Sequence, residues 1–276
     1  MDKTNQPCIG VFDSGVGGLS VLKEIQKQLP ETSLLYIADQ AHVPYGKKDL
    51  SEIREYAMAI THFLINAGAR LIVIACNTAS AAALKRLRQD FPSMLFVGME
   101  PAIKPAALNT RSGIVGVLAT PATFEAEMFH SLVDRFAHDI RVLTNTAPGL
   151  VESVEAGQLN SPSTRAIIEN GIRPMIDKGA DKIVLGCTHF PFVHSLIQEI
   201  AGPKVEIIDP APAIARRTAY LFKENDIGLS CHSGESLCLA TSGNAIKFHN
   251  SVKELLGIDS DILQLQWEGI NLVVDR

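Results

Sequence analysis

The chain has 276 residues, of which 46% are hydrophobic and 20% are charged, and its formal net charge is −5. The hydrophobic fraction is that of a globular protein with a core, whereas the negative charge and the lack of a long basic run argue against nucleic acid as a partner. No apolar run reaches the about 18 residues of a membrane span, no basic amphipathic stretch predicts binding to a membrane surface, and the first residues lack the apolar stretch of a secretory signal. We therefore expect a cytoplasmic protein that does not bind membranes.

Short apolar runs alternate with amphipathic segments along most of the chain. The runs are continuously apolar, which is typical of strands in a parallel sheet that is buried on both faces. In chain order we expect a strand at 9–12, a helix at 19–28, a strand at 34–38, a helix at 51–66, a strand at 71–75, a helix at 79–89, strands at 95–98 and 114–118, helices at 121–136 and 166–177, a strand at 182–185, a helix at 192–200 and a strand at 205–208. This alternation predicts the α/β class with doubly wound parallel sheets, whose ligands lie beyond the carboxyl ends of the strands.

A weak internal repeat divides the chain. Residues 68–78 align without gaps onto 179–189, and residues 10–14 can be laid onto 116–120 at a nearly equal separation. Parallel strands rich in Ile and Val resemble one another in any case, but this explains less easily the Gly-Ala before each strand and the Cys followed by Asn or Thr after it.

The repeat predicts two similar α/β lobes. The first would comprise residues 1–97 plus 209–276 and carry Cys76, and the second would comprise residues 98–208 and carry Cys187.

The cysteines indicate a reducing compartment, because their number is odd, their spacing is wide and no Cys-x-x-Cys occurs. They are Cys8, Cys76, Cys187, Cys231 and Cys238. Only Cys187 and His189 have the short spacing of metal ligands, so we predict no metal site. We interpret Cys8, Cys231 and Cys238 as structural.

Cys76 and Cys187 each follow a strand directly and precede a predicted helix. The positive end of a helix dipole favours a thiolate, by up to about 1.5 pKa units, from an ordinary thiol value of about 8.5. Cysteine often merely fills a core, so either thiol alone is weak evidence. Two thiols at equivalent places in two lobes favour function.

Two matched acid/base groups suit the inversion of a stereocentre, because one group removes the α-proton and the other returns a proton to the opposite face. Hydrolysis by a cysteine nucleophile needs one thiol with a histidine partner and leaves the second thiol unexplained.

Two loops beside strand ends could add binding groups. Asp13 opens a glycine-rich turn at residues 13–18 that can bind an anion at a helix N-terminus but has neither the phosphate-loop nor the dinucleotide spacing. Residues 39–46 could offer backbone N–H groups and a phenol to a substrate, although an ordinary Pro-Tyr-Gly turn explains them equally well. His189 is within reach of the same pocket as Cys187.

Taken together, the motifs resemble those of the cofactor-independent aspartate/glutamate racemase family. The resemblance runs from about Ile9 to Gly257, and its two cysteine motifs with the Asp-Ser-Gly turn are highly specific as a set. The matching segments are 11–19, 36–39 with 44–46, 75–79, 185–191, 208–210 and 241–243.

The resemblance implies two α/β lobes with the active site between them. It also implies racemisation of glutamate without pyridoxal phosphate, metal or other cofactor. It implies that Cys76 and Cys187 are the acid/base thiols, that Asp13 assists Cys76 and that His189 assists Cys187. The family's Val-Glu-x-Gly segment selects Glu155 as a further catalytic group, with Glu152 as an open alternative. The implied substrate-binding residues are Ser14, Pro44, Tyr45, Gly46, Asn77, Thr78, Thr120 and Thr188.

Two departures from the family pattern occur. Ala119 precedes Thr120 where the family usually has glycine, and residues 145–148 stand where it often has Ala-Cys-Pro. The second weakens the alignment around Glu152 and Glu155.

Three functional readings follow from the resemblance. The first is a glutamate racemase that supplies D-glutamate for peptidoglycan and could form a homodimer. The second is a sister racemase acting on aspartate or another acidic amino acid. The third is a binding or regulatory protein, for example one that restrains DNA gyrase, although such a protein has no need of two thiols with their supporting residues.

Overall fold

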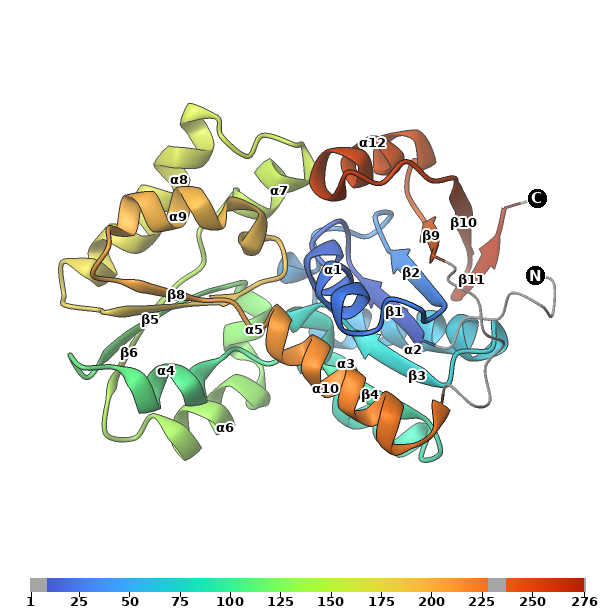
Figure 1. Cartoon of the computed structure of the whole chain (residues 1–276), viewed down its shortest axis with the longest axis horizontal. Helices are drawn as coiled ribbons and strands as arrows, with labels where there is room; N and C mark the ends of the chain where they lie inside the picture. Colours follow the sequence, from blue (N-terminus) through green and yellow to red (C-terminus); the bar gives the residue numbers. More distant parts are fainter. Residues whose placement is uncertain (1–8, 228–236, 276) are drawn as a thin grey trace.

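The protein is described by a computed structural model that covers residues 9–227 and 237–275 (Figure 1). Cys8 and Cys231, which we interpreted as structural, lie outside these residues. The strands are β1 (Ile9–Asp13), β2 (Leu34–Ala38), β3 (Leu71–Ile74), β4 (Leu95–Gly98), β5 (Ile114–Ala119), β6 (Arg141–Asn145), β7 (Lys182–Gly186), β8 (Glu206–Ile208), β9 (Leu237–Thr241), β10 (Ile262–Glu268) and β11 (Asn271–Val274). They form a seven-stranded sheet in the order β11-β10-β9-β2-β1-β3-β4 and a four-stranded sheet in the order β6-β5-β7-β8.

Helices cover both sheets. The α-helices are α1 (Leu19–Gln28), α2 (Leu50–Asn66), α3 (Asn77–Asp90), α4 (Ile103–Asn109), α5 (Pro121–Glu125), α6 (Glu127–Phe136), α7 (Leu150–Glu155), α8 (Pro162–Ile176), α9 (His194–Ala201), α10 (Ala211–Glu224) and α12 (Ala245–Leu256), and the 3-10 helices are η2 (Tyr45–Lys47) and η3 (Phe190–Val193).

The continuously apolar strands are buried on both faces, as predicted. Side chains alternate across a strand, so Val11 packs toward α1 and α10 while its neighbour Phe12 packs toward α2 and α3. In the second sheet, Val117 packs toward α4 and α6, and Leu118 packs toward α8 and α9. The α/β class and the parallel pairing of the central strands are confirmed, and Figure 1 shows the two sheets side by side, each between its helices.

Several elements differ from the prediction. The helix expected at 121–136 is divided into α5 and α6 at Ala126, whose backbone is extended. Strands β6, β9, β10 and β11 were not predicted, and β11 pairs with β10 antiparallel at the edge of the larger sheet. Helices α4, α7, α10 and α12 were not predicted either.

The larger sheet takes its strands from β1–β4 and β9–β11, and the smaller sheet takes β5–β8. The domain boundaries of residues 1–97 plus 209–276 and residues 98–208 stay a prediction. Within the described residues, none of the helices combines the length and the apolarity that crossing a bilayer requires.

Candidate active site

A small cavity lies where the carboxyl ends of β1, β3, β5 and β7 meet. Its volume is about 20 Å³, which holds roughly one water molecule. The lining residues are Ser14, Pro44, Tyr45, Gly46, Cys76, Asn77, Thr78, Thr120, Val151, Cys187, Thr188 and His189. The structure thus brings together both predicted thiols, His189 and every predicted substrate-binding residue. Asp13 and Glu155 lie behind this lining, in contact with it.

Cys76 occupies the N-cap of α3, and its sulfur accepts a hydrogen bond from the backbone N–H of Ala79 at 3.4 Å. The thiol in turn donates to the hydroxyl of Ser14 at 3.9 Å. The predicted helix N-terminus is therefore present beside Cys76, but it is not the largest influence on the pKa of this thiol. Burial and the nearby charge of Asp13 raise the pKa of Cys76 far above its ordinary value, against the hydrogen bonds from Ala79 and Ser14 that lower it. Cys76 is held as a thiol in this structure.

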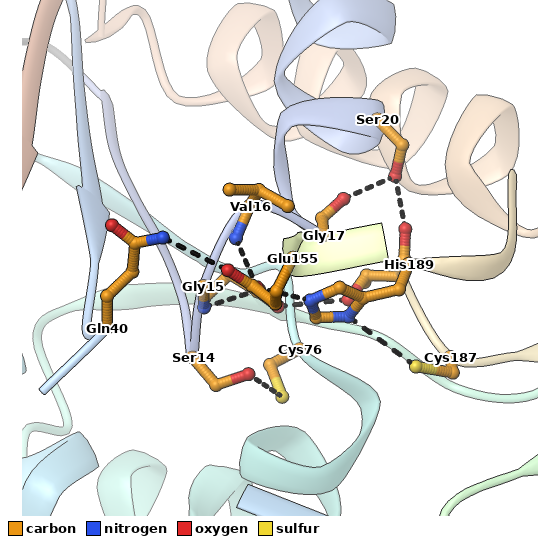
Figure 2. A network of polar contacts seen from close by, with 12 residues as sticks. Ser14, Gly15, Val16, Gly17, Ser20, Gln40, Cys76, Glu155, Cys187 and His189 are labelled. Carbon is orange, nitrogen blue, oxygen red and sulfur yellow. Dashed lines mark hydrogen bonds and ion pairs between the residues drawn. The ribbon is translucent and has the colours of Figure 1, made fainter. Parts of the chain in front are cut away.

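The helix expected directly after Cys187 is wrong in type. Residues Phe190–Val193 form the short 3-10 helix η3, and α9 starts only at His194, so Cys187 is not the N-cap of the helix that follows it, as Cys76 is. Its polar neighbour is instead the Nδ1 atom of His189, at 3.7 Å (Figure 2). The two thiols thus have unlike surroundings.

His189 joins Cys187 to Glu155. Its ring is buried, and its Nε2 atom lies 2.6 Å from Oε1 of Glu155. Burial disfavours the charged imidazolium, but the hydrogen bonds and charges of Cys187 and Glu155 outweigh it and raise the pKa of His189 well above its ordinary value. The imidazolium is therefore the favoured form beside Cys187.

The glycine-rich turn binds an anion of the protein itself. The backbone N–H of Val16 donates to Oε1 of Glu155 at 2.8 Å, and a Cβ atom on Gly15 would lie 1.9 Å from the same oxygen. Burial disfavours the carboxylate, but the hydrogen bond and charge of His189 and the Val16 N–H outweigh it and lower the pKa of Glu155. Glycine is required at position 15 because the carboxylate approaches its backbone so closely.

The alternative Glu152 lies elsewhere. It forms an ion pair with Lys47 at the surface, where both side chains are largely exposed. Of the two carboxylates that the sequence left open, Glu155 is the one in contact with His189.

Asp13 connects the two halves of the site. It is fully buried, accepts the backbone N–H of Gly15 at 2.9 Å and accepts the hydroxyl of Thr188 at 3.0 Å. Burial raises the pKa of Asp13, although the charge of His189 and the Gly15 N–H lower it in part. Its charge contributes to the raised pKa of Cys76, and the assistance of Asp13 to Cys76 in catalysis stays a prediction.

Threonine hydroxyls line another wall. Oγ1 of Thr78 lies 2.8 Å from Oγ1 of Thr120, and Thr123 lies within hydrogen-bonding distance of both. A Cβ atom on Gly46 would lie 2.6 Å from Cβ of Thr120, so the loop fits there only with glycine. Thr123 was not predicted, because it lies inside α5 and away from a strand end.

The phenol of Tyr45 was expected to face a substrate. Its hydroxyl instead donates to Oδ2 of Asp39 at 2.6 Å. Asp39 is fully buried and also accepts from Ser242 and from the indole N–H of Trp267. Asp39 therefore anchors the loop that carries Tyr45 and Gly46 to β10 and to the end of β9.

Asn77 is the polar residue of the cavity that has no protein partner. It is 2% exposed, and among the described residues neither its amide nitrogen nor its amide oxygen has a hydrogen-bond partner. A buried amide without a partner costs about 1–3 kcal/mol, which points to a ligand that supplies the missing bonds.

Two further observations concern cofactors and missed residues. Within residues 9–227 and 237–275, no group of three or more His, Cys, Asp or Glu side chains is placed to hold a metal ion. Val151, on α7, lines the cavity but carries no chemical signal in the sequence. Cys238 lies half-buried in β9 and is not part of the lining.

The His189→Asn variant tests the charged state of the histidine through stability. A histidine whose folded pKa is raised contributes stability that is fully present below about pH 6.5 and is lost as the pH rises through the folded value. The free energy of unfolding of the wild type should therefore exceed that of the variant most at pH 6 and progressively less toward pH 9.5. Urea unfolding at several pH values measures this, and a pH-independent difference would contradict a charged His189.

Known proteins resemble this chain along most of its length. A sequence model described as Asp/Glu/Hydantoin racemase matches residues 9–218. A glutamate racemase of Roseiflexus sp. is 47% identical over 256 residues, which are 92% of this chain and 93% of that relative. A glutamate racemase of Pseudomonas aeruginosa is 53% identical over 209 residues, which are 76% of this chain and 79% of that relative.

Solved structures of glutamate racemases resemble the fold of this chain. Glutamate racemase isoform RacE1 of Bacillus anthracis superposes with a TM-score of 0.84 at 28% identity, covering 97% of this chain and 99% of that one. Escherichia coli glutamate racemase in complex with L-glutamate and the activator UDP-MurNAc-Ala gives a TM-score of 0.79 at 34% identity, covering 91% of this chain and 95% of that one. The chain belongs to the Asp/Glu/Hydantoin racemase family of isomerases.

Proposed function

We propose that the protein interconverts L- and D-glutamate by proton exchange with two thiols, Cys76 and Cys187, and without a cofactor. The observation that carries the proposal is that one thiol beside each sheet lines the same small cavity. The names of the relatives support glutamate as the substrate.

The two thiols would meet the substrate in different surroundings. His189, in contact with Cys187, would balance the negative charge of a thiolate there during the reaction, whereas burial and the charge of Asp13 raise the pKa of Cys76 and favour its thiol form. The Cys187 thiolate would take the α-proton, breaking the C–H bond and forming an S–H bond. The electron pair stays on the α-carbon and is delocalised into its carboxyl group. The Cys76 thiol then gives its proton to the opposite face, and the reverse reaction exchanges the two roles.

Polar groups around the thiols would bind the substrate's charged ends. Thr78 and Thr120 from one side and Thr188 from the other place hydroxyls at the cavity wall, and the N-terminus of α3 offers backbone N–H groups. Groups fixed in place before the reaction stabilise the charge that develops at the substrate carboxylate, because they need no reorganisation.

Asn77→Leu is expected to separate binding from folding. The amide has no protein partner to lose, so the melting temperature should not fall. A hydrogen bond to a charged substrate group contributes about 1.5–3 kcal/mol, so kcat/KM for glutamate should fall about 10- to 100-fold. A variant that melts early and keeps full kcat/KM would show that Asn77 is structural.

The activity is tested by circular dichroism of the purified protein with D-glutamate, L-glutamate and both aspartate enantiomers, without added cofactor. We expect the optical signal of both glutamate enantiomers to decay to zero. In deuterium oxide the newly formed enantiomer should carry deuterium at the α-carbon, because the thiol that delivers the proton exchanges with solvent. Decay with aspartate alone would move the assignment to an aspartate racemase, and no decay with any of them would contradict an amino-acid racemase.

We also propose that the D-glutamate formed in the cytoplasm serves peptidoglycan synthesis. The support is that the relatives are bacterial glutamate racemases and that the Escherichia coli relative was solved with an activator named UDP-MurNAc-Ala. A deletion strain should grow only when D-glutamate is supplied, and growth without it would contradict this role. A homodimer stays a prediction.

A further inference from the structure

Gln40 lies outside the cavity lining but reaches the group that holds His189. It lies two residues after the end of β2, is half-buried, and its side-chain amide donates to Oε2 of Glu155 at 3.0 Å. Figure 2 shows Glu155 between Gln40 on one side and His189 on the other. No motif in the sequence distinguished this residue.

The two oxygens of Glu155 have separate partners. Oε1 accepts from Val16 and is in contact with Nε2 of His189, whereas Gln40 is the one hydrogen-bond donor to Oε2 among the residues that the structure describes. A carboxylate rotates easily about its last side-chain bond. The contact with Gln40 therefore fixes which oxygen faces the imidazole.

Gln40 is itself held in one orientation. The hydroxyl of Thr241, at the end of β9, donates to its Oε1 at 3.0 Å, which leaves the NH₂ group for Glu155. A Cβ atom on Gly243 would lie 2.6 Å from Cβ of Gln40, so the side chain is also packed against the backbone there. Thr241 and Gly243 lie beyond residue 218, where the family match ends.

A continuous series of contacts thus runs from β9 to one thiol only. It joins Thr241, Gln40, Glu155, His189 and Cys187. Cys76, by contrast, has separate contacts with Ser14 and Ala79.

We propose that Gln40 is a positioning residue for the Cys187 side of the reaction, which it affects through Glu155 and His189. This rests on the proposed racemase function. Without the amide, the carboxylate of Glu155 loses one of its donors and holds the imidazolium less firmly. A carboxyl group in place of the amide would lie 3.0 Å from Oε2 of Glu155, so the two carboxyl groups would share one proton and a donor to Oε2 would be kept.

The charged and titratable groups that face His189 come from three parts of the chain. They are Cys187 from the loop after β7, Glu155 from α7 and Asp13 from β1, whereas Glu152 of α7 lies in its surface ion pair with Lys47 and the charge of His189 acts on it least of its surroundings. Gln40 is uncharged and touches only Glu155 among them, so its replacement changes the histidine through that one carboxylate.

The test compares the pH dependence of kcat/KM for Gln40→Met, Gln40→Glu and wild type, because this profile reports the ionisations of the free enzyme. Gln40→Met should lower kcat/KM about tenfold, as expected for the loss of a hydrogen bond to a charged group. It should also move the limb of the pH profile that reports the ionisation of His189 to lower pH. Gln40→Glu, in which the shared proton restores the donor to Glu155, should leave this limb near its wild-type position. Thr241→Val removes the hydrogen bond that orients the side-chain amide of Gln40. It should shift the limb in the same direction as Gln40→Met, but by a smaller amount.

Lys47→Met is the matched control. It breaks the exposed ion pair that Lys47 forms with Glu152, a residue of the same helix α7 as Glu155, and it leaves Glu155 untouched. Therefore kcat/KM should stay within about twofold, and the limb of the pH profile should not move. A limb that does not move in Gln40→Met, or that moves as far in Gln40→Glu as in Gln40→Met, would overturn the inference. If the wild type itself fails to racemise glutamate, the proposed function fails instead, so the two failures are distinguishable.

Discussion

Cys76→Ser and Cys187→Ser are each expected to lower kcat for glutamate by about 10³-fold or more in both directions. A serine hydroxyl holds its proton far more tightly than a thiol, so it can neither take the α-proton nor return one at neutral pH. Because each direction of the reaction uses both groups, a single replacement stops both directions. The decay of the circular dichroism signal, started from either enantiomer, measures the effect.

Cys238→Ser is the control for this experiment. Cys238 is a free cysteine that is not part of the cavity lining, so its replacement should change kcat by less than about twofold. The melting temperatures of the two catalytic variants should lie near that of the wild type. Turnover within tenfold of the wild type in either Cys76→Ser or Cys187→Ser would contradict the two-thiol mechanism.

Gly15→Ala is expected to lower kcat/KM by about 10²-fold. The added methyl group would lie 1.9 Å from Oε1 of Glu155, so the carboxylate must move and His189 loses its partner. A displacement of about 1 Å in a catalytic constellation is enough for a loss of this size. The backbone of Gly15 is not in the left-handed region, so the effect comes from the lost space and not from strain of the turn.

A double-mutant cycle with Glu155→Ala separates these explanations. Shortening residue 155 clears the space in front of Gly15, so in that background Gly15→Ala should change kcat/KM by less than about threefold. If the two losses multiply instead, alanine at position 15 harms the enzyme through the turn itself, and the contact with Glu155 is not its cause.

The sequence was sufficient for the elements whose burial is complete. Strands such as β2 and β3 are continuously apolar because both faces are covered, and this pattern identifies them without knowledge of the fold. Strand β10 alternates polar and apolar residues near the sheet edge, and α7 is only six residues long. Neither pattern is strong enough to be recognised in one sequence.

The candidate site divides in the same way. Cys76 and Cys187 could be predicted because each comes at the carboxyl end of a parallel strand, and such positions gather at one edge of a sheet. Thr120 was identified only through the resemblance to the family. The contacts between the two halves of the site could not be predicted from the sequence. That Glu155 and not Glu152 lies against the glycine turn depends on how α7 packs on the other half, and the partnership of Gln40 with Glu155 joins residues far apart in the sequence.

The size of the cavity has a consequence for the rate at which ligands bind. A space of about 20 Å³ cannot receive an amino acid, so the walls from the two sheets must separate before glutamate enters. Association would then be limited by this opening at high ligand concentration. Inhibitors of very different affinity would share one maximal association rate, and they would differ in how slowly they leave.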